Sequence, residues 1–90
     1  MYRILIADDE ILMRKGLCTL IDWQKFDCQI VGTAENGLQA KQAVIDLQPD
    51  ILIADIKMPV LDGLELAQWI HASQLQVQII LLTAFADFSY

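Results

Sequence analysis

The sequence has few basic residues. Its 90 residues include 6 Lys and Arg against 12 Asp and Glu, which gives a formal net charge of −6. Nucleic acids and anionic membrane surfaces are bound through basic patches, because both present a dense negative charge. We therefore expect that this chain itself binds neither nucleic acid nor a membrane.

The sequence also lacks a long hydrophobic run, although 56% of its residues are hydrophobic. A membrane-spanning helix needs roughly 20 apolar residues, and no run approaches that length. The first residues lead directly into an apolar segment and do not resemble a signal peptide. Only two cysteines are present, Cys18 and Cys28, and these are too few for a disulfide framework. Together these absences predict one small cytoplasmic domain over residues 1–90, with reduced, structural cysteines.

What the sequence does contain is a regular alternation of strand-type and helix-type segments. Apolar runs predict β-strands at 2–7, 29–34, 51–54 and 78–82. Apolar spacing and capping residues predict helices over 10–21, after Asn36 and after Asp62, with a plain loop at 22–27 and room for a fourth helix after residue 83. This order favours an α/β fold with a parallel sheet and helices on both faces.

Two of the expected strands end in acidic residues. Asp8 and Asp9 follow the first strand, and Asp55 follows the third. Because parallel strands end at the same edge of a sheet, these three side chains should meet there. Carboxylates repel one another by roughly 4 kcal/mol per pair at 4 Å and an effective dielectric near 20, so such a cluster needs a cation or a proton. A hard divalent ion, Mg²⁺ first, is the expected occupant.

Further residues extend this pattern. The acidic run Asp8-Asp9-Glu10, the segment 55–59 with Asp62-Gly63, and Thr83 together resemble the receiver domain of bacterial two-component response regulators. The resemblance runs in order along the whole chain. Asp22-Trp23, Asn36-Gly37 and the segment 55–59 resemble receivers of the YesN type, whose full-length proteins carry an AraC-type helix-turn-helix output domain.

The resemblance implies a flavodoxin-like three-layer sandwich with strand order 2-1-3-4-5. It makes Asp55 the phosphoacceptor, with Thr83 as a hydrogen-bond donor to the phosphoryl group. It makes Asp9 a direct Mg²⁺ ligand, Asp8 a ligand through water, and the backbone carbonyl of Lys57 a further ligand. The donor would be a phosphohistidine on a sensor histidine kinase, and the chain would be a switch for a transcriptional output domain, not an enzyme.

The family pattern is not complete in this sequence. The family also uses a lysine at the end of a fifth strand and an aromatic switch residue earlier on that strand, and neither follows Thr83 here. We therefore expect the strand order 2-1-3-4, in a receiver that is incomplete at its C-terminus. Strand 78–82 would then form an exposed edge, and such edges recruit other chains. Self-association through this edge is the expected consequence.

Two other functions stay open. A pseudo-receiver would be a folded interaction module without phosphotransfer. A Mg²⁺-dependent phosphohydrolase would use Asp55 as its nucleophile, but such enzymes usually place a carboxylate two residues further on, where this chain has Lys57. Some residues near the pattern have simpler interpretations. For Glu10 two roles stay open, a place in the acidic pocket or stabilisation of the first turn of a helix. Met13 and Trp69 belong in or beside the core, and His71 lies at the surface.

Overall fold

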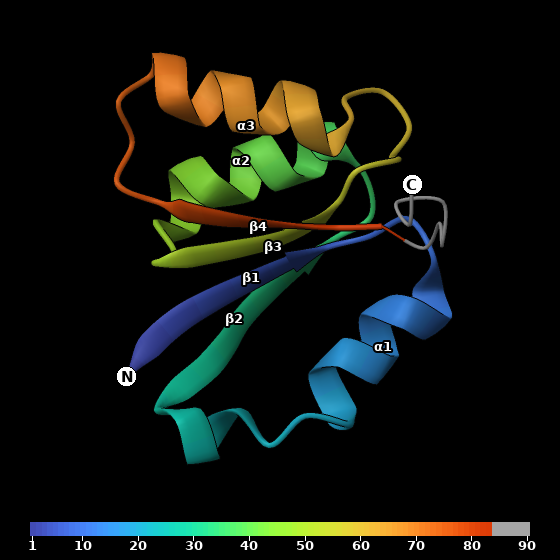
Figure 1. The fold of residues 1–90 in the computed structure, drawn as a ribbon, viewed down its shortest axis with the longest axis vertical. Coiled ribbons are helices and arrows are strands. Elements are labelled where there is room, and N and C mark those ends of the chain that lie inside the picture. Colours follow the sequence, from blue (N-terminus) through green and yellow to red (C-terminus); the bar gives the residue numbers. More distant parts are fainter. Residues whose placement is uncertain (84–90) are drawn as a thin grey trace, which may run out of the picture.

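The structure is a computed structural model that describes residues 1–83, and the expected fourth helix lies outside the described residues. Four parallel strands form one sheet in the order β2-β1-β3-β4. Helix α1 covers one face of this sheet, and α2 and α3 cover the other (Figure 1). The described elements are β1 (Tyr2–Ala7), α1 (Ile11–Thr19), the 3₁₀-helix η1 (Trp23–Phe26), β2 (Cys28–Ala34), α2 (Gly37–Leu47), β3 (Ile51–Asp55), α3 (Gly63–Ala72) and β4 (Gln78–Leu82). The predicted three-layer fold and strand order are confirmed.

The buried residues of the central strands β1 and β3 are apolar because both faces of these strands are covered. Successive side chains of a strand point to opposite faces of the sheet. Ile4 and Ile6 accordingly pack on the side of α1, and Leu5 and Ala7 pack on the side of α2 and α3. All four are at most 1% exposed. Two apolar clusters therefore hold the three layers together.

The two helices on the far face begin where the sequence places capping residues. The side chain of Asn36 accepts a hydrogen bond from the backbone N–H of Gln39 at 2.8 Å, at the start of α2. Asp62 and Glu65 form a reciprocal capping box at the start of α3. Each cap satisfies backbone donors that a helix N-terminus leaves without partners. Both predicted helix starts are confirmed.

The first helix is shorter than predicted, and the segment after it is not a plain loop. The indole N–H of Trp23 donates to the backbone carbonyl of Leu17 at 2.9 Å, and this carbonyl is one that continued helix would have used. The chain leaves α1 after Thr19 and forms η1 instead. Leu20, which lies inside the predicted helix 10–21, follows the end of α1 and is 85% exposed. Among residues 1–83, none of the helices has the length and apolar character needed to cross a membrane.

Candidate functional site

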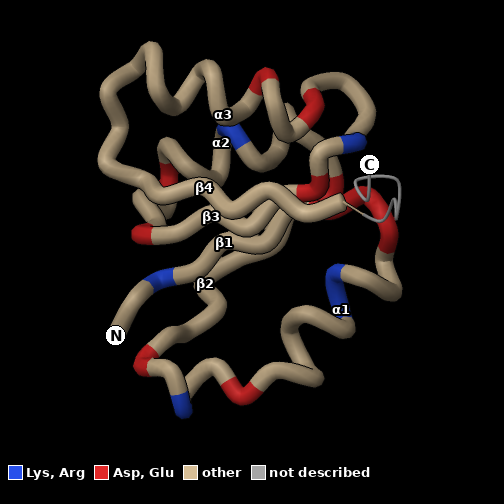
Figure 2. Tube along the Cα trace, viewed as in Figure 1, with Lys and Arg blue, Asp and Glu red and all other residues tan. Residues whose placement is uncertain are grey.

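Three carboxylates meet at the carboxyl end of the sheet. Strands β1 and β3 are neighbours with Ala7 opposite Ala54, so that the residues following them emerge side by side. One oxygen from each of Asp8, Asp9 and Asp55 lies within 4.8 Å of the others. Figure 2 shows acidic residues gathered at this end of the sheet, beside the start of α1. The predicted convergence of the three aspartates is confirmed.

The three side chains differ in their surroundings. Asp8 is buried, with 3% of its surface exposed, whereas Asp55 is half-buried and Asp9 is exposed. The backbone N–H of Glu10 donates to Asp8 Oδ1 at 2.9 Å. The backbone N–H of Lys57 donates to Asp55 Oδ1 at 3.2 Å. These local hydrogen bonds orient two of the carboxylates at the edge of the sheet.

The burial of Asp8 affects its titration. Desolvation raises the pKa of this carboxyl above its ordinary value, and the charges of Asp55, Asp9 and Glu10 raise it further. The hydrogen bond from the Glu10 backbone acts in the opposite direction. The net direction is upward, because burial and three like charges disfavour the ionised form. Burial and the neighbouring carboxylates therefore make the ionised form of Asp8 less favourable than that of a solvent-exposed aspartate.

These residues fit a hard divalent cation. Carboxylate oxygens are the ligands that Mg²⁺ prefers, and Mg²⁺ is bound in proteins through a small number of carboxylates with water completing the shell. A cation among Asp8, Asp9 and Asp55 would offset the repulsion that raises the pKa of Asp8. Both the donor set and the electrostatics thus suit the predicted metal.

The remaining predicted residues lie around this cluster. Asp8 and Asp55 line a pocket of about 230 Å³ together with Thr83, Glu10 and Met13, among others. Thr83 and the expected phosphoacceptor Asp55 therefore line the same pocket. Met13 was predicted to lie in or beside the core, and it is 43% exposed. Met13 lies in the first turn of α1 and lines this pocket.

A second set of predicted residues lies on the adjoining surface. Asp9 and Lys57 line a shallow depression with Met58 and Pro59. Gly63 closes the loop behind it, because its N–H donates to the Ile56 carbonyl at 2.9 Å. A Cβ atom at Gly63 would lie 2.5 Å from the Asp55 carbonyl oxygen. This close approach explains why the Asp-Gly pair that opens α3 belongs to the site pattern.

One residue at the site was missed by the sequence analysis. Arg14 Nη1 donates to the backbone carbonyl of Asp8 at 2.7 Å. Its Nη2 lies 3.6 Å from Glu35 Oε1, and the Arg14 side chain is only 13% exposed. The available signal was a cation close to the N-terminus of a helix, where the helix dipole favours anions.

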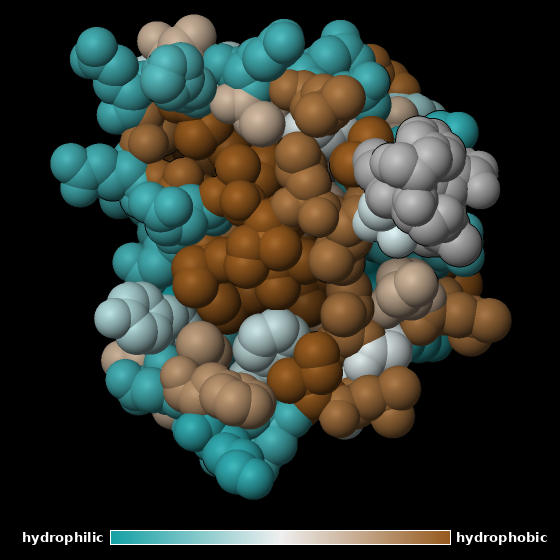
Figure 3. Space-filling view, in the orientation of Figure 1, coloured by the Kyte–Doolittle hydropathy of each residue, from teal (hydrophilic) through white to brown (hydrophobic). Residues whose placement is uncertain are grey.

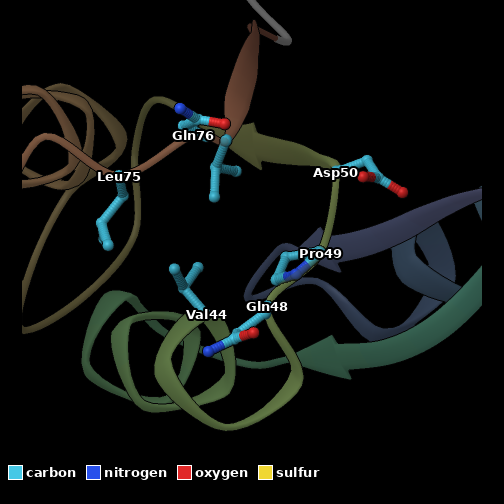
Figure 4. Close-up of a pocket in the computed structure, with 7 residues that line it drawn as sticks. Val44, Gln48, Pro49, Asp50, Leu75 and Gln76 are labelled. Atoms are coloured by element: carbon cyan, nitrogen blue, oxygen red, sulfur yellow. The ribbon is translucent and has the colours of Figure 1, made fainter.

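A further pocket lies at the opposite end of the sheet, where strands β3 and β4 begin. It lies between the end of α2 and the segment entering β4 (Figure 4). Its volume is about 270 Å³, and Val44 and Pro49 form part of its wall. The Asp50 carboxylate beside it accepts a hydrogen bond from the backbone N–H of Arg3 at 2.8 Å. None of the predicted site residues lines this pocket, and Asp50 has a structural role there.

The comparisons with known proteins agree with this geometry. Residues 4–90 match the response regulator receiver domain family. The chain is 41% identical over 90 residues to the transcriptional regulatory protein YesN of Bacillus subtilis, covering all of this chain and 24% of YesN. It superimposes with a TM-score of 0.88 on the receiver (REC) domain of the response regulator AraT of Geobacillus stearothermophilus, at 35% identity over 99% of this chain and 69% of that one.

A third relative was solved with a ligand. The response regulator TrrA of Thermotoga maritima, in complex with Mg²⁺-BeF, superimposes with a TM-score of 0.83 at 38% identity, over 99% of this chain and 75% of that one. The chain belongs to the response regulator receiver domain family. It spans about a quarter of the length of YesN.

Proposed function

We propose that this chain is the phosphoacceptor part of a two-component response regulator and that Asp55 receives the phosphoryl group. The observation that carries the proposal is the convergence of three carboxylates within 4.8 Å at the ends of adjacent strands. The presence of Thr83 in the pocket that Asp55 lines supports it. The complex of the relative TrrA with Mg²⁺-BeF supports the choice of metal.

The proposed chemistry is an in-line phosphoryl transfer. An Asp55 carboxylate oxygen forms a bond to phosphorus while the phosphorus–nitrogen bond of a donor phosphohistidine breaks, and the imidazole leaves and takes up a proton. A carboxylate and a phosphoryl group repel each other, and Mg²⁺ when bound would offset that repulsion. Asp9 would ligate the metal directly, Asp8 would do so through water, and the Lys57 backbone carbonyl would complete the protein ligands.

The product would act as a local electrostatic switch. A phosphorylated side chain carries roughly −1.5 to −2 charges and three strong hydrogen-bond acceptors. The Thr83 hydroxyl would donate to one of these oxygens, and the position of Thr83 in the lining of the Asp55 pocket supports this role. A movement of Thr83 toward the phosphoryl group would shift the end of β4 and so bias a two-state element. The chain would thereby signal rather than turn over a substrate.

The proposed partner is a sensor histidine kinase, and the place of action is the cytoplasm. A protein donor must approach over the pocket mouth, and α1 borders that mouth through Met13. Leu12 and Leu20, which are 80% and 85% exposed, line an apolar groove along α1 that also includes Met13. Exposed apolar surface of this kind is typical of protein interfaces. Replacing both leucines by serine should slow transfer from a phosphohistidine protein and leave transfer from acetyl phosphate unchanged.

The proposed output is transcriptional, through an AraC-type DNA-binding domain in the full-length protein. The description of the relative YesN as a transcriptional regulatory protein supports the transcriptional output. Because the chain itself has a formal net charge of −6, any DNA contact would be made by that other domain.

The test is phosphate incorporation in the protein that contains this chain. Wild type should incorporate acid- and base-labile phosphate from acetyl phosphate in Mg²⁺ and not in EDTA. Asp55→Asn should abolish incorporation, whereas the control Asp46→Asn, an exposed carboxylate on α2, should not. Incorporation at the wild-type level in Asp55→Asn would contradict the proposal. A folded, Mg²⁺-binding protein without incorporation would instead favour an interaction module, and turnover of a small phosphomonoester would favour a phosphohydrolase.

A further inference from the structure

We propose that Arg14 is a positioning residue for the metal site. Its guanidinium fixes the Asp8 peptide at the start of the acidic loop, which consists of Asp8, Asp9 and Glu10. The inference rests on the proposed function, since it concerns the Mg²⁺ affinity of the same three aspartates. It assigns a role to a residue that neither binds the metal nor touches the reacting atoms.

The guanidinium of Arg14 contacts two loops at once. Nη1 donates to the Asp8 backbone carbonyl at 2.7 Å, which is a short, well-formed hydrogen bond. Nη2 lies 3.6 Å from the carboxylate of Glu35, in the segment that joins β2 to α2. The planar guanidinium can make both contacts at once, whereas an ammonium group is a single point charge. The position of the Asp8 peptide is therefore tied to the neighbouring loop.

The place of Arg14 in the sequence supports a role beyond helix formation. Its own N–H donates to the Glu10 carbonyl at 3.0 Å, in the first hydrogen-bonded turn of α1. A cation near a helix N-terminus opposes the helix dipole, which is an unfavourable interaction. A long polar side chain that is only 13% exposed also loses conformational freedom. Both costs are offset only if the two contacts of the guanidinium matter to the fold or to the site.

The peptide that Arg14 holds connects two of the proposed metal ligands. The carbonyl held by Arg14 belongs to Asp8, and the next peptide carries Asp9. The Asp8 carboxylate is in turn held by the Glu10 backbone N–H at 2.9 Å. Loss of the Arg14 hydrogen bond would free this short loop to rotate, and the two carboxylates would no longer face Asp55. Residues that orient metal ligands in this way commonly alter metal affinity by about 10- to 100-fold.

A purely electrostatic role of Arg14 predicts the opposite effect. A positive charge near the site repels Mg²⁺, so its removal should strengthen metal binding if charge alone matters. The sign of the change therefore separates positioning from charge. Lys15, the adjacent cation on α1, provides the matched control, because it carries the same charge on an exposed side chain.

The experiment measures the Mg²⁺ dissociation constant in the protein that contains this chain, from amide chemical shifts during a Mg²⁺ titration. Arg14→Ala should raise the dissociation constant about tenfold. Arg14→Lys, which keeps the charge but not the fork, should also raise it. Lys15→Ala should leave it unchanged or lower it. In EDTA, hydrogen exchange of the Glu10 amide should be faster in both Arg14 variants than in wild type and Lys15→Ala.

The outcomes are distinguishable. Tighter Mg²⁺ binding in Arg14→Ala, or full retention of affinity in both Arg14 variants, would overturn the positioning role. A wild-type protein that binds no Mg²⁺ would overturn the proposed function instead. The Glu10 exchange rates in EDTA would still test whether Arg14 holds the Asp8 peptide in place. A variant that only weakened the fold would change the free energy of unfolding, so Leu17→Ala, which loosens the packing of α1 under the sheet, serves as the stability control.

Discussion

Gly37 lies so close to Leu61 that a Cβ atom built on the glycine would come within 1.8 Å of the Leu61 carbonyl oxygen. Gly37 is the first residue of α2, and Leu61 belongs to the loop between β3 and α3. The contact joins two backbones, so no side-chain rotation can relieve a clash. The loop that follows the phosphoacceptor is thus packed against a helix that is distant in sequence.

Gly37→Ala should destabilise the protein by about 1–3 kcal/mol, because the added methyl group forces the helix and the loop apart. Urea denaturation followed by circular dichroism measures the change. Gly16→Ala is the matched control. Its nearest neighbour would be a Leu20 side-chain atom at 3.7 Å, and alanine in a helix interior should stabilise by up to about 1 kcal/mol. Equal effects of the two substitutions would show that the close approach is not a constraint.

Val60 is a second test of the same loop. Its φ is 73°, in the region that glycine favours, and the Leu61 N–H donates across it to the Pro59 carbonyl at 2.8 Å. A β-branched residue is strained in this conformation. Because Val60 is 76% exposed, little apolar burial is lost on its removal. Val60→Gly should therefore raise the free energy of unfolding by about 1 kcal/mol.

The control for this prediction is Val60→Ala, which keeps a Cβ atom and so keeps most of the strain. It should leave the midpoint of urea denaturation close to that of wild type. If Val60→Gly is no more stable than Val60→Ala, the flexibility of glycine in the unfolded state outweighs the strain that it relieves in the folded state.

The parts of the fold that the sequence predicts well are those determined by local signals. The apolar runs of β1 and β3 indicate strands covered on both faces, and Asn36 and Asp62 mark helix starts through hydrogen bonds within one turn. The predicted end of α1 was wrong because the actual end depends on a contact from outside the helix. The Trp23 indole N–H donates a hydrogen bond to the Leu17 carbonyl, and the spacing of apolar residues does not predict that hydrogen bond.

The candidate site shows the same division. The three aspartates were predictable, since strand order alone places Asp8 and Asp55 side by side. Arg14 was not, because its partners are a backbone carbonyl and a residue of another loop. Met13 is a related case. Its apolar character favours a place in or beside the core, but in the first turn of α1 it is 43% exposed and lines the pocket of Asp8 and Asp55.

Asp8→Asn should make the metal-free protein more stable near neutral pH, by roughly 0.5–2 kcal/mol. The substitution removes a buried charge and its repulsion from Asp55 and Asp9 while keeping an acceptor for the Glu10 N–H. In wild type the pKa of Asp8 is raised in the folded state. Its contribution is therefore fully present below the ordinary value near 3.8 and is lost as the pH rises through the raised value.

The difference between the Asp8→Asn variant and wild type should thus be small at pH 4 and grow toward neutral pH. Thermal unfolding in EDTA across this pH range measures it. Addition of Mg²⁺ should stabilise wild type by linkage and stabilise the variant less, since one ligand has lost its charge. A difference that is constant with pH would contradict the assignment of the effect to the Asp8 carboxyl.

Strand β4 pairs with β3 and with no other strand among the described residues. Its outer edge therefore presents backbone N–H and C=O groups beside apolar side chains, and Ile80 is 48% exposed. Figure 3 shows hydrophobic surface across the middle of the molecule in the view that has β4 in front. Unprotected strand edges of this kind pair with other chains unless a charge or a covering element blocks them.

A polypeptide of these 90 residues, expressed alone, should therefore self-associate through the β4 edge. Light scattering should give an apparent mass that rises with concentration in the micromolar range. Ile80→Lys places a charge on the edge and should shift the protein toward monomer. Ile45→Lys, at an exposed position on α2 with a similar 51% exposure, should have no such effect, because α2 offers no free strand edge. A folded polypeptide that stays strictly monomeric, or equal effects of the two lysines, would show that association does not proceed through this strand.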